Sequence, residues 1–126
     1  MVTAVSTSAR PAPAAEAADL IARASDLAGR FATRADAHDR DGSFPFENFE
    51  ELFKSGLLSL TIPIALGGSE AGAQTVVRVL QIIGQADPST ALVLSMHYLQ
   101  HFIMVRSERW FACRAGSPAN RSRALP

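Results

Sequence analysis

The dipeptide Asp87-Pro88 is the feature that most restricts how this chain can fold. An aspartate accepts hydrogen bonds from the free N–H groups at a helix start, and proline suits the first helical position because it lacks an N–H. We therefore predict a helix from Ser89 to about Arg106. Its apolar residues are spread over most of its circumference: Leu92, Val93, Leu94, Met96, Leu99, Phe102, Ile103 and Met104. Such a helix is typically buried on several sides, so we expect other helices to surround it.

Two more helices are predicted before residue 57. The first spans Ala14 to about His38, followed by a loop over 39–43, and Gly29 favours a kink or fraying because glycine costs about 1 kcal/mol relative to alanine in a helix. Its apolar residues recur at three- and four-residue steps, at Leu20, Ala24, Leu27, Ala28 and Phe31. The next helix is predicted to begin at Pro45 and to stop at Gly56. Its buried stripe is expected to consist of Phe46, Phe49, Leu52 and Phe53.

Beyond Gly56 the chain predicts an extended link and one more helix. Residues 57–66 are apolar and contain Pro63, which excludes a helix interior. The helix over Ala73 to Ala86 is expected to face inward with Val76, Val77, Leu80, Ile83 and Gly84. The fold class is therefore all-α, a helical bundle with no sheet of three or more strands. We predict a helical domain over 14–110, a disordered lead-in over 1–13 and an irregular basic tail over 111–126.

Composition excludes several classes of partner and compartment. Lys plus Arg and Asp plus Glu number 12 each, so the whole chain has no net field to recruit nucleic acid or anionic lipid. The N-terminus lacks the apolar run of a secretory signal, and no stretch approaches the roughly 18 apolar residues of a membrane span. The single Cys113 cannot form an internal disulfide. We expect a cytoplasmic protein that binds neither nucleic acid nor a membrane.

No complete catalytic or metal-binding constellation is visible. The acidic stretch before Gly42 has the wrong residues at both ends for a calcium loop, and Gly67-Gly68 lacks dinucleotide-binding spacing. His97 and His101 share a helix face but have no third ligand, so a core or pocket-lining pair is the favoured interpretation. The serines carry no local signature of an activated nucleophile. We therefore expect no catalytic residue and no metal site.

Residues 39–110 nevertheless resemble the N-terminal helical domain of the acyl-CoA dehydrogenase family. The order and spacing of the matching motifs carry the resemblance: Asp41 to Pro45, Leu52 to Leu58, Thr61-Ile62-Pro63, Gly67-Gly68 and Gly84 to Ser95. The resemblance implies a flavoenzyme in which FAD accepts a hydride and a carboxylate takes a proton from an acyl-CoA. It also implies that the helix from Pro88 lines the acyl pocket. The wall residues would be Ala91, Ser95, Met96 and Leu99.

The family's flavin contacts and catalytic base lie mostly in later domains, so we do not expect this chain alone to bind FAD tightly or to oxidise acyl-CoA. Residues after about Trp110 depart from the family pattern, which suggests a truncation or a reading-frame shift. Two alternatives stay open: the same domain of a flavin-dependent monooxygenase, and a non-catalytic helical interaction module. We also expect self-association, through an apolar surface of Leu92, Met96, Leu99 and Phe102.

Overall fold

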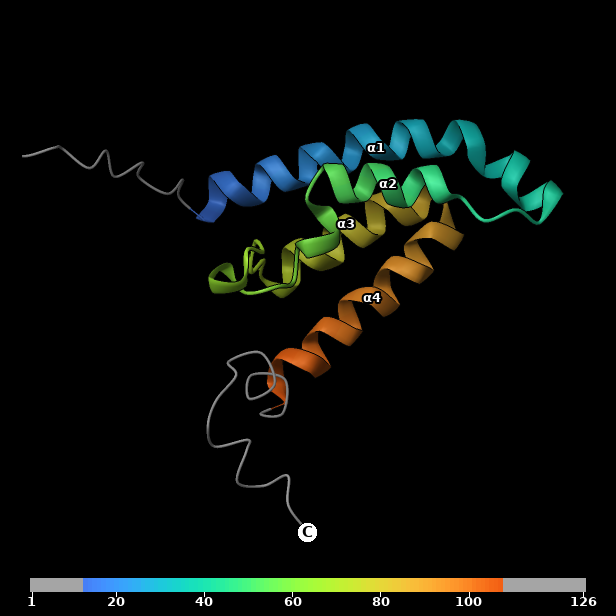
Figure 1. The fold of residues 1–126 in the computed structure, drawn as a ribbon. Coiled ribbons are helices and arrows are strands. Elements are labelled where there is room, and N and C mark those ends of the chain that lie inside the picture. The colour runs from blue at the N-terminus through green and yellow to red at the C-terminus, as the bar shows by residue number, and fades with distance from the viewer. Residues whose placement is uncertain (1–12, 108–126) are drawn as a thin grey trace, which may run out of the picture.

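The computed structural model describes residues 13–107, which form a helical domain (Figure 1). Its elements are α1 (Pro13–Asp41), α2 (Phe46–Lys54), the 3-10 helices η1 (Leu57–Ser59) and η2 (Ile64–Leu66), α3 (Ala73–Ala86) and α4 (Pro88–Arg106). Figure 1 shows α1 along one side of α2 and α3, with α4 crossing at an angle beyond them. No strand occurs between residues 13 and 107, which confirms the all-α prediction. Apart from Pro13, the predicted lead-in and tail lie outside the described residues.

The core lies between α1 and α3. The apolar stripe predicted for α1 is buried at every position: Leu20, Ala24, Leu27, Ala28 and Phe31. Opposite them α3 buries Val76, Val79 and Ile83. Burying each large aliphatic or aromatic side chain contributes about 1.5–3 kcal/mol, so this contact stabilises the domain substantially. The helix continues through Gly29 without a break.

Three details of the helix predictions are wrong. The predicted loop at 39–41 is the last turn of α1, which continues to Asp41, and Gly42 follows with a positive φ of 63°. In α2, Phe46 and Phe53 are 74% and 73% exposed, because the face that includes Asn48 and Leu52 turns toward the core. In α3, Val77 is 53% exposed, since it lies about 100° around the helix from Val76.

The segment between α2 and α3 is not extended as predicted. Gly56 adopts the left-handed conformation, as expected of a helix stop, and two 3-10 turns follow it. The segment then folds back on itself through backbone hydrogen bonds: the N–H of Ser69 donates to the carbonyl of Ser59, and the N–H of Ala71 to that of Leu60. Proline at 63 and left-handed Gly67 turn the chain between these two halves.

α4 lies at the edge of the described domain and contacts α3 and η1. Its inner side buries Thr90, Leu94 and Tyr98. The opposite side carries four exposed apolar residues, here called the α4 outer stripe: Leu92, Met96, Leu99 and Ile103, between 48% and 65% exposed. The expectation that helices surround α4 is wrong for the described part of the chain, which covers one side only. A helix that is apolar on both faces needs a second partner surface.

Candidate functional site on helix α4

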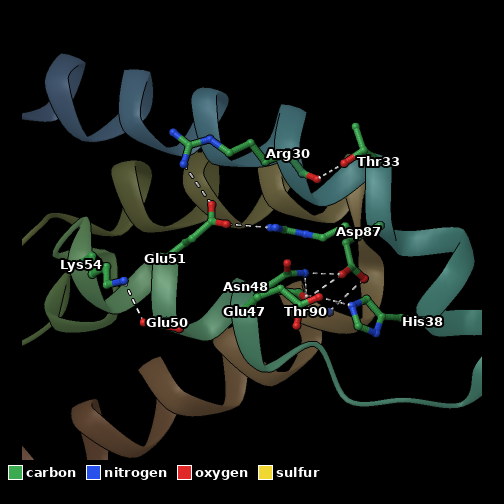
Figure 2. A network of polar contacts seen from close by, with 11 residues as sticks. Arg30, Thr33, His38, Glu47, Asn48, Glu50, Glu51, Lys54, Asp87 and Thr90 are labelled. Atoms are coloured by element: carbon green, nitrogen blue, oxygen red, sulfur yellow. Dashed lines mark hydrogen bonds and ion pairs between the residues drawn. The ribbon is translucent and has the colours of Figure 1, made fainter.

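A buried hydrogen-bond network fixes the start of α4 (Figure 2). One carboxylate oxygen of Asp87 accepts from the backbone N–H groups of Ser89 and Thr90, at 3.1 and 3.2 Å. The other oxygen accepts from the Thr90 hydroxyl at 2.6 Å and from the Asn48 amide at 3.0 Å. Asp87 is 4% exposed, and Asn48 and Thr90 are fully buried. Asp87 therefore positions α4 against α2, and both of its oxygens are occupied by that task.

Ion pairs between charged residues also join α1 to α2. Glu51 accepts from Arg30 and Arg34, at 3.1 and 3.0 Å (Figure 2). Buried Asn48 Oδ1 and Arg34 Nε have no hydrogen-bond partner in the structure. Unpaired polar atoms of this kind are costly, which makes the neighbourhood of Asn48 sensitive to substitution.

The middle of α4 is fastened to the segment after α2. The Tyr98 hydroxyl donates to the carbonyl of Leu57 at 2.7 Å, and burial raises the pKa of that hydroxyl. His97 Nε2 lies 3.0 Å from the carbonyl oxygen of Leu58, so this nitrogen carries the proton. His101 Nδ1 lies 3.0 Å from the Thr61 hydroxyl. These contacts fix the position of α4 relative to residues 57–61.

The two histidines form a pair, with ring centroids 4.2 Å apart in an edge-to-face arrangement. Both rings are partly buried. No group of three His, Cys, Asp or Glu side chains able to hold a metal is found among residues 13–107.

We expect His101 to make the domain less stable in mild acid. Burial, with the nearby His97, lowers the pKa of His101, so the folded state favours the neutral ring. The unfolded chain then binds more protons, and its histidine titrates near pH 6.5; stability is therefore full above about pH 6.5 and falls as the pH drops toward 5. The midpoint of urea unfolding, measured at pH 7.5 and 5.5, should decrease.

His101→Asn should flatten this dependence. An unchanged slope in that variant would contradict the assignment to His101. The pKa of Glu47 is also lowered, first by its backbone hydrogen bond and then by the hydrogen bond from His38. Its contribution is lost only as the pH falls below about 4.5, so the two windows are separate.

The four pocket-wall residues inferred from the resemblance lie in different environments. Ala91 is half-buried and packs against the core. Ser95 is half-buried, and its hydroxyl donates to the carbonyl of Leu92 at 2.7 Å. Met96 and Leu99 are 52% and 48% exposed and belong to the α4 outer stripe. Ala91, Ser95 and Leu99 are four residues apart and follow one ridge of the helix, whereas Met96 lies beside it.

A small apolar hollow adjoins α4 on the side of α2. Its volume is about 230 Å³, and its lining residues are Gly42, Ser43, Phe44, Pro45, Phe49, Ser89 and Val93. Phe44 stacks on Phe49 with ring centroids 5.2 Å apart. Pockets for drug-sized ligands usually measure about 300–1,000 Å³, so this hollow suits one end of an apolar group. Sequence analysis missed it because Phe49 was assigned to the core and Phe44 to no element.

A second feature that the sequence did not indicate lies at the end of α1. His38 Nδ1 is 2.8 Å from the Ser43 hydroxyl, and its Nε2 is 2.7 Å from Glu47. His38 and Ser43 also border a cleft of about 530 Å³ beside Asp87. Because Ser43 is exposed and Glu47 is 42% exposed, these two contacts join the end of α1 to α2 and to the turn before it at a solvent-exposed site. The arrangement holds the turn that leads into α2.

Helix α4 exposes apolar surface, and the N–H groups at its start are already occupied. The N–H groups of Ser89 and Thr90, which could otherwise bind a phosphate, already donate to Asp87. α4 contains no acidic residue and no lysine. Helix α4 can therefore contribute apolar surface to one wall of a site, and its only charged side chain is that of Arg106 in the last turn.

Comparisons with known proteins identify the family. Residues 15–126 match the family described as "Acyl-CoA dehydrogenase, N-terminal domain", a match that includes the segment predicted as a tail. The chain is 38% identical over 95 residues to a protein named "Probable FMNH2-dependent monooxygenase SfnC" from Pseudomonas putida, covering 75% of this chain and 22% of the relative. It is 41% identical over 64 residues to "L-evernosamine nitrososynthase" from a Micromonospora species, covering 50% of this chain and 15% of the relative.

No solved structure matches the chain. Among the described helices, none combines the length and the apolar character needed to cross a membrane. The chain spans about a fifth of the length of the Pseudomonas relative. The match over residues 15–126 covers most of the sequence and agrees with the four-helix fold. The chain therefore belongs to the acyl-CoA dehydrogenase family and corresponds to its N-terminal domain.

Proposed function

We propose that this chain is the N-terminal domain of a flavin-dependent monooxygenase of this family. Its helix α4 would form one wall of the site that binds substrate and flavin. The observation that carries the proposal is the 38% identity, over 75% of the chain, to the protein named an FMNH2-dependent monooxygenase. The second relative, named a nitrososynthase, is likewise not named a dehydrogenase. We therefore prefer monooxygenation to the FAD-dependent oxidation of acyl-CoA that the family resemblance first implied.

The chemistry of α4 supports a wall and not a catalytic centre. Bound reduced flavin would supply the electrons that activate oxygen, and the wall would keep water away from that reaction. Leu99 and Met96 expose apolar surface, and Ser95 and Ala91 lie beside them. The helix has no carboxylate that could abstract a proton. The same apolar wall would also suit an acyl-CoA, so α4 alone does not favour either reaction.

The chain on its own should be catalytically incomplete. With FAD, a dye acceptor and acyl-CoAs of several lengths, we expect only background dye reduction. With reduced FMN we expect only the oxygen consumption of free flavin. Turnover above background in either assay, lost on mutation of one acidic residue, would contradict the proposal that this domain supplies only a wall.

A chimera tests the preferred reaction. Residues 15–107 would replace the corresponding segment of the Pseudomonas putida relative, with the unmodified relative measured beside it. We expect the chimera to keep oxygen consumption that depends on reduced FMN within about tenfold of the parent, and to show no dye reduction with acyl-CoA. A chimera that gains acyl-CoA-dependent dye reduction would contradict the proposal and favour the dehydrogenase.

Two matched variants of the chimera separate the wall from general surface effects. Leu99 on α4 and Val77 on α3 are 48% and 53% exposed. Leu99→Asp should reduce the activity at least tenfold, whereas Val77→Asp should leave it within about twofold. Equal effects of the two substitutions would show that α4 does not line the site.

A further inference from the structure

Ser43, His38 and Glu47 are arranged as a nucleophile, a base and an orienting carboxylate. His38 Nδ1 lies 2.8 Å from the Ser43 hydroxyl, and Nε2 of the same ring lies 2.7 Å from a carboxylate oxygen of Glu47. At such distances a base can take a proton from a hydroxyl group. His38 belongs to the last turn of α1 and Glu47 to the first turn of α2, with Ser43 in the turn between them. The arrangement therefore exists only once the chain has folded, and no short sequence motif indicates it.

The charge of Glu47 determines which nitrogen of His38 carries the proton. The pKa of Glu47 is lowered, first by a backbone hydrogen bond and then by the hydrogen bond from His38, so this carboxylate is ionised at neutral pH. An ionised carboxylate only accepts hydrogen bonds, so Nε2 of the ring must be the donor. In the neutral ring Nδ1 then has a free lone pair, which accepts the hydrogen bond from the Ser43 hydroxyl. His38 is therefore oriented to act as a base toward Ser43.

Ser43 lines two adjoining cavities of different character. The hollow of about 230 Å³ is walled by the rings of Phe44 and Phe49 and by Val93. The cleft of about 530 Å³ is lined by Ser43 together with His38. Ser43 is exposed, whereas the side chain of His38 is 19% exposed. A substrate can therefore reach the hydroxyl group, with a small apolar group in the hollow and a larger group in the cleft.

We propose that Ser43 is a nucleophile that accepts the acyl group of carboxylic esters with a short apolar acyl chain and a phenol as leaving group. The size of the hollow limits the acyl chain. The N–H of Ser43 donates to the carbonyl of His38 at 3.2 Å, so it is not available to stabilise an oxyanion. A site without that help requires a good leaving group, which a phenol provides. The proposal does not depend on the flavin reaction proposed above.

The reaction needs no reactant besides the ester and water. The Ser43 oxygen attacks the carbonyl carbon while its proton passes to His38 Nδ1, and Glu47 stabilises the resulting imidazolium. The bond from the carbonyl carbon to the phenolic oxygen breaks, and that oxygen takes the electron pair and then the proton from His38. Water attacks the acyl-serine in the same way, giving its proton to Nδ1, and the Ser43 oxygen leaves and recovers the proton. The products are a carboxylic acid and a phenol.

Hydrolysis of p-nitrophenyl esters by the purified 126-residue chain tests the proposal. We expect release of p-nitrophenol above the rate in buffer. The kcat/KM for the butyrate should be about tenfold higher than for the acetate, the effect of burying two further methylene groups in the hollow. A fluorophosphonate, which reacts irreversibly with activated serines, should label Ser43, as identified by mass spectrometry of the digested chain.

Three substitutions separate the roles of the residues. Ser43→Ala and His38→Gln should each lower kcat/KM at least tenfold, because the first removes the nucleophile and the second cannot accept its proton. Glu47→Gln keeps the length of the side chain and an accepting oxygen but removes the charge. It should lower kcat about tenfold and leave KM within about twofold, whereas a purely structural loss of the turn would also raise KM.

Ser25→Ala is the matched control, since Ser25 is an exposed serine of α1 whose hydroxyl donates to a backbone carbonyl. It should leave kcat/KM within about twofold of the unmodified chain. Circular dichroism of each variant checks that helix content is unchanged, and labelling of the unmodified chain does not depend on how the variants fold. Hydrolysis no faster than in buffer, or a fluorophosphonate that does not label Ser43, would overturn the proposal. So would activity that survives Ser43→Ala, or an equal loss in Ser25→Ala.

Discussion

Asp87→Ala is expected to lower the free energy of unfolding by at least about 3 kcal/mol. Loss of a helix cap costs about 1 kcal/mol. Two buried polar groups, the Asn48 amide and the Thr90 hydroxyl, also lose an acceptor, and each such loss costs about 1–3 kcal/mol. Both residues are fully buried, so water cannot replace the carboxylate without a rearrangement. Urea unfolding followed by circular dichroism measures the change.

Two companion substitutions divide this effect into its parts. Asp87→Ser keeps an oxygen that can accept from the N–H groups of Ser89 and Thr90, so it should recover about 1 kcal/mol of the loss. Asp26→Ala removes an exposed aspartate of α1 and should change stability by less than about 0.5 kcal/mol. If Asp87→Ala cost no more than Asp26→Ala, the buried network would not be holding α4 against α2.

The same residue shows why some of this structure could be predicted from sequence. The cap formed by Asp87 and the start of α4 at Pro88 depend on neighbouring residues only, and both predictions are confirmed. The bounds of α3, Ala73–Ala86, are also as predicted. The hydrogen bond from Asn48 to Asp87 joins residues 39 apart, and no local pattern indicates it.

That distant contact also explains the errors in α2. Helical periodicity predicted that Phe46 and Phe53 are buried. In the structure, Asn48 faces Asp87 instead, and both phenylalanine rings are exposed. A nine-residue helix is too short for apolar spacing to fix its orientation when a buried polar contact competes. The apolar circumference of α4 predicted burial on several sides, whereas the described residues cover one side only, because the sequence pattern does not show which neighbours lie against the helix.

The candidate site likewise has a part that could be predicted from sequence and a part that could not. Resemblance supplied Ala91, Ser95, Met96 and Leu99, and the role of these residues as a pocket wall stays a prediction. The hollow beside Phe44 and Val93 could not be anticipated, because it depends on how the turn at 42–45 lies against α4. Sequence can place a residue on a helix, whereas the angle between two helices is set by contacts far apart in the chain.

Gly68→Ala is expected to destabilise the domain by about 2–3 kcal/mol, the range typical of forcing extra atoms into a packed site. A Cβ on Gly68 would lie less than 3.0 Å from the carbonyl oxygen and carbon of Ile62. These are backbone atoms, and the same carbonyl accepts from the N–H of Glu70 at 2.9 Å, so they cannot turn aside as a side chain can. The methyl group must therefore open the folded-back segment between α2 and α3.

The consequence should reach α4, because that segment presents the carbonyl of Leu57 to Tyr98 and the hydroxyl of Thr61 to His101. Hydrogen exchange should rise at the N–H groups of Glu70 and Ala71 in Gly68→Ala, while the amides of α1 and α3 stay protected. Gly29→Ala is the matched control: no atom lies within 4 Å of its added Cβ, and alanine in mid-helix should stabilise by up to about 1 kcal/mol. A Gly68→Ala variant as stable as the unmodified chain would contradict this prediction. It would show that the turn at 62–68 can accommodate a methyl group and that the position of α4 does not depend on the turn.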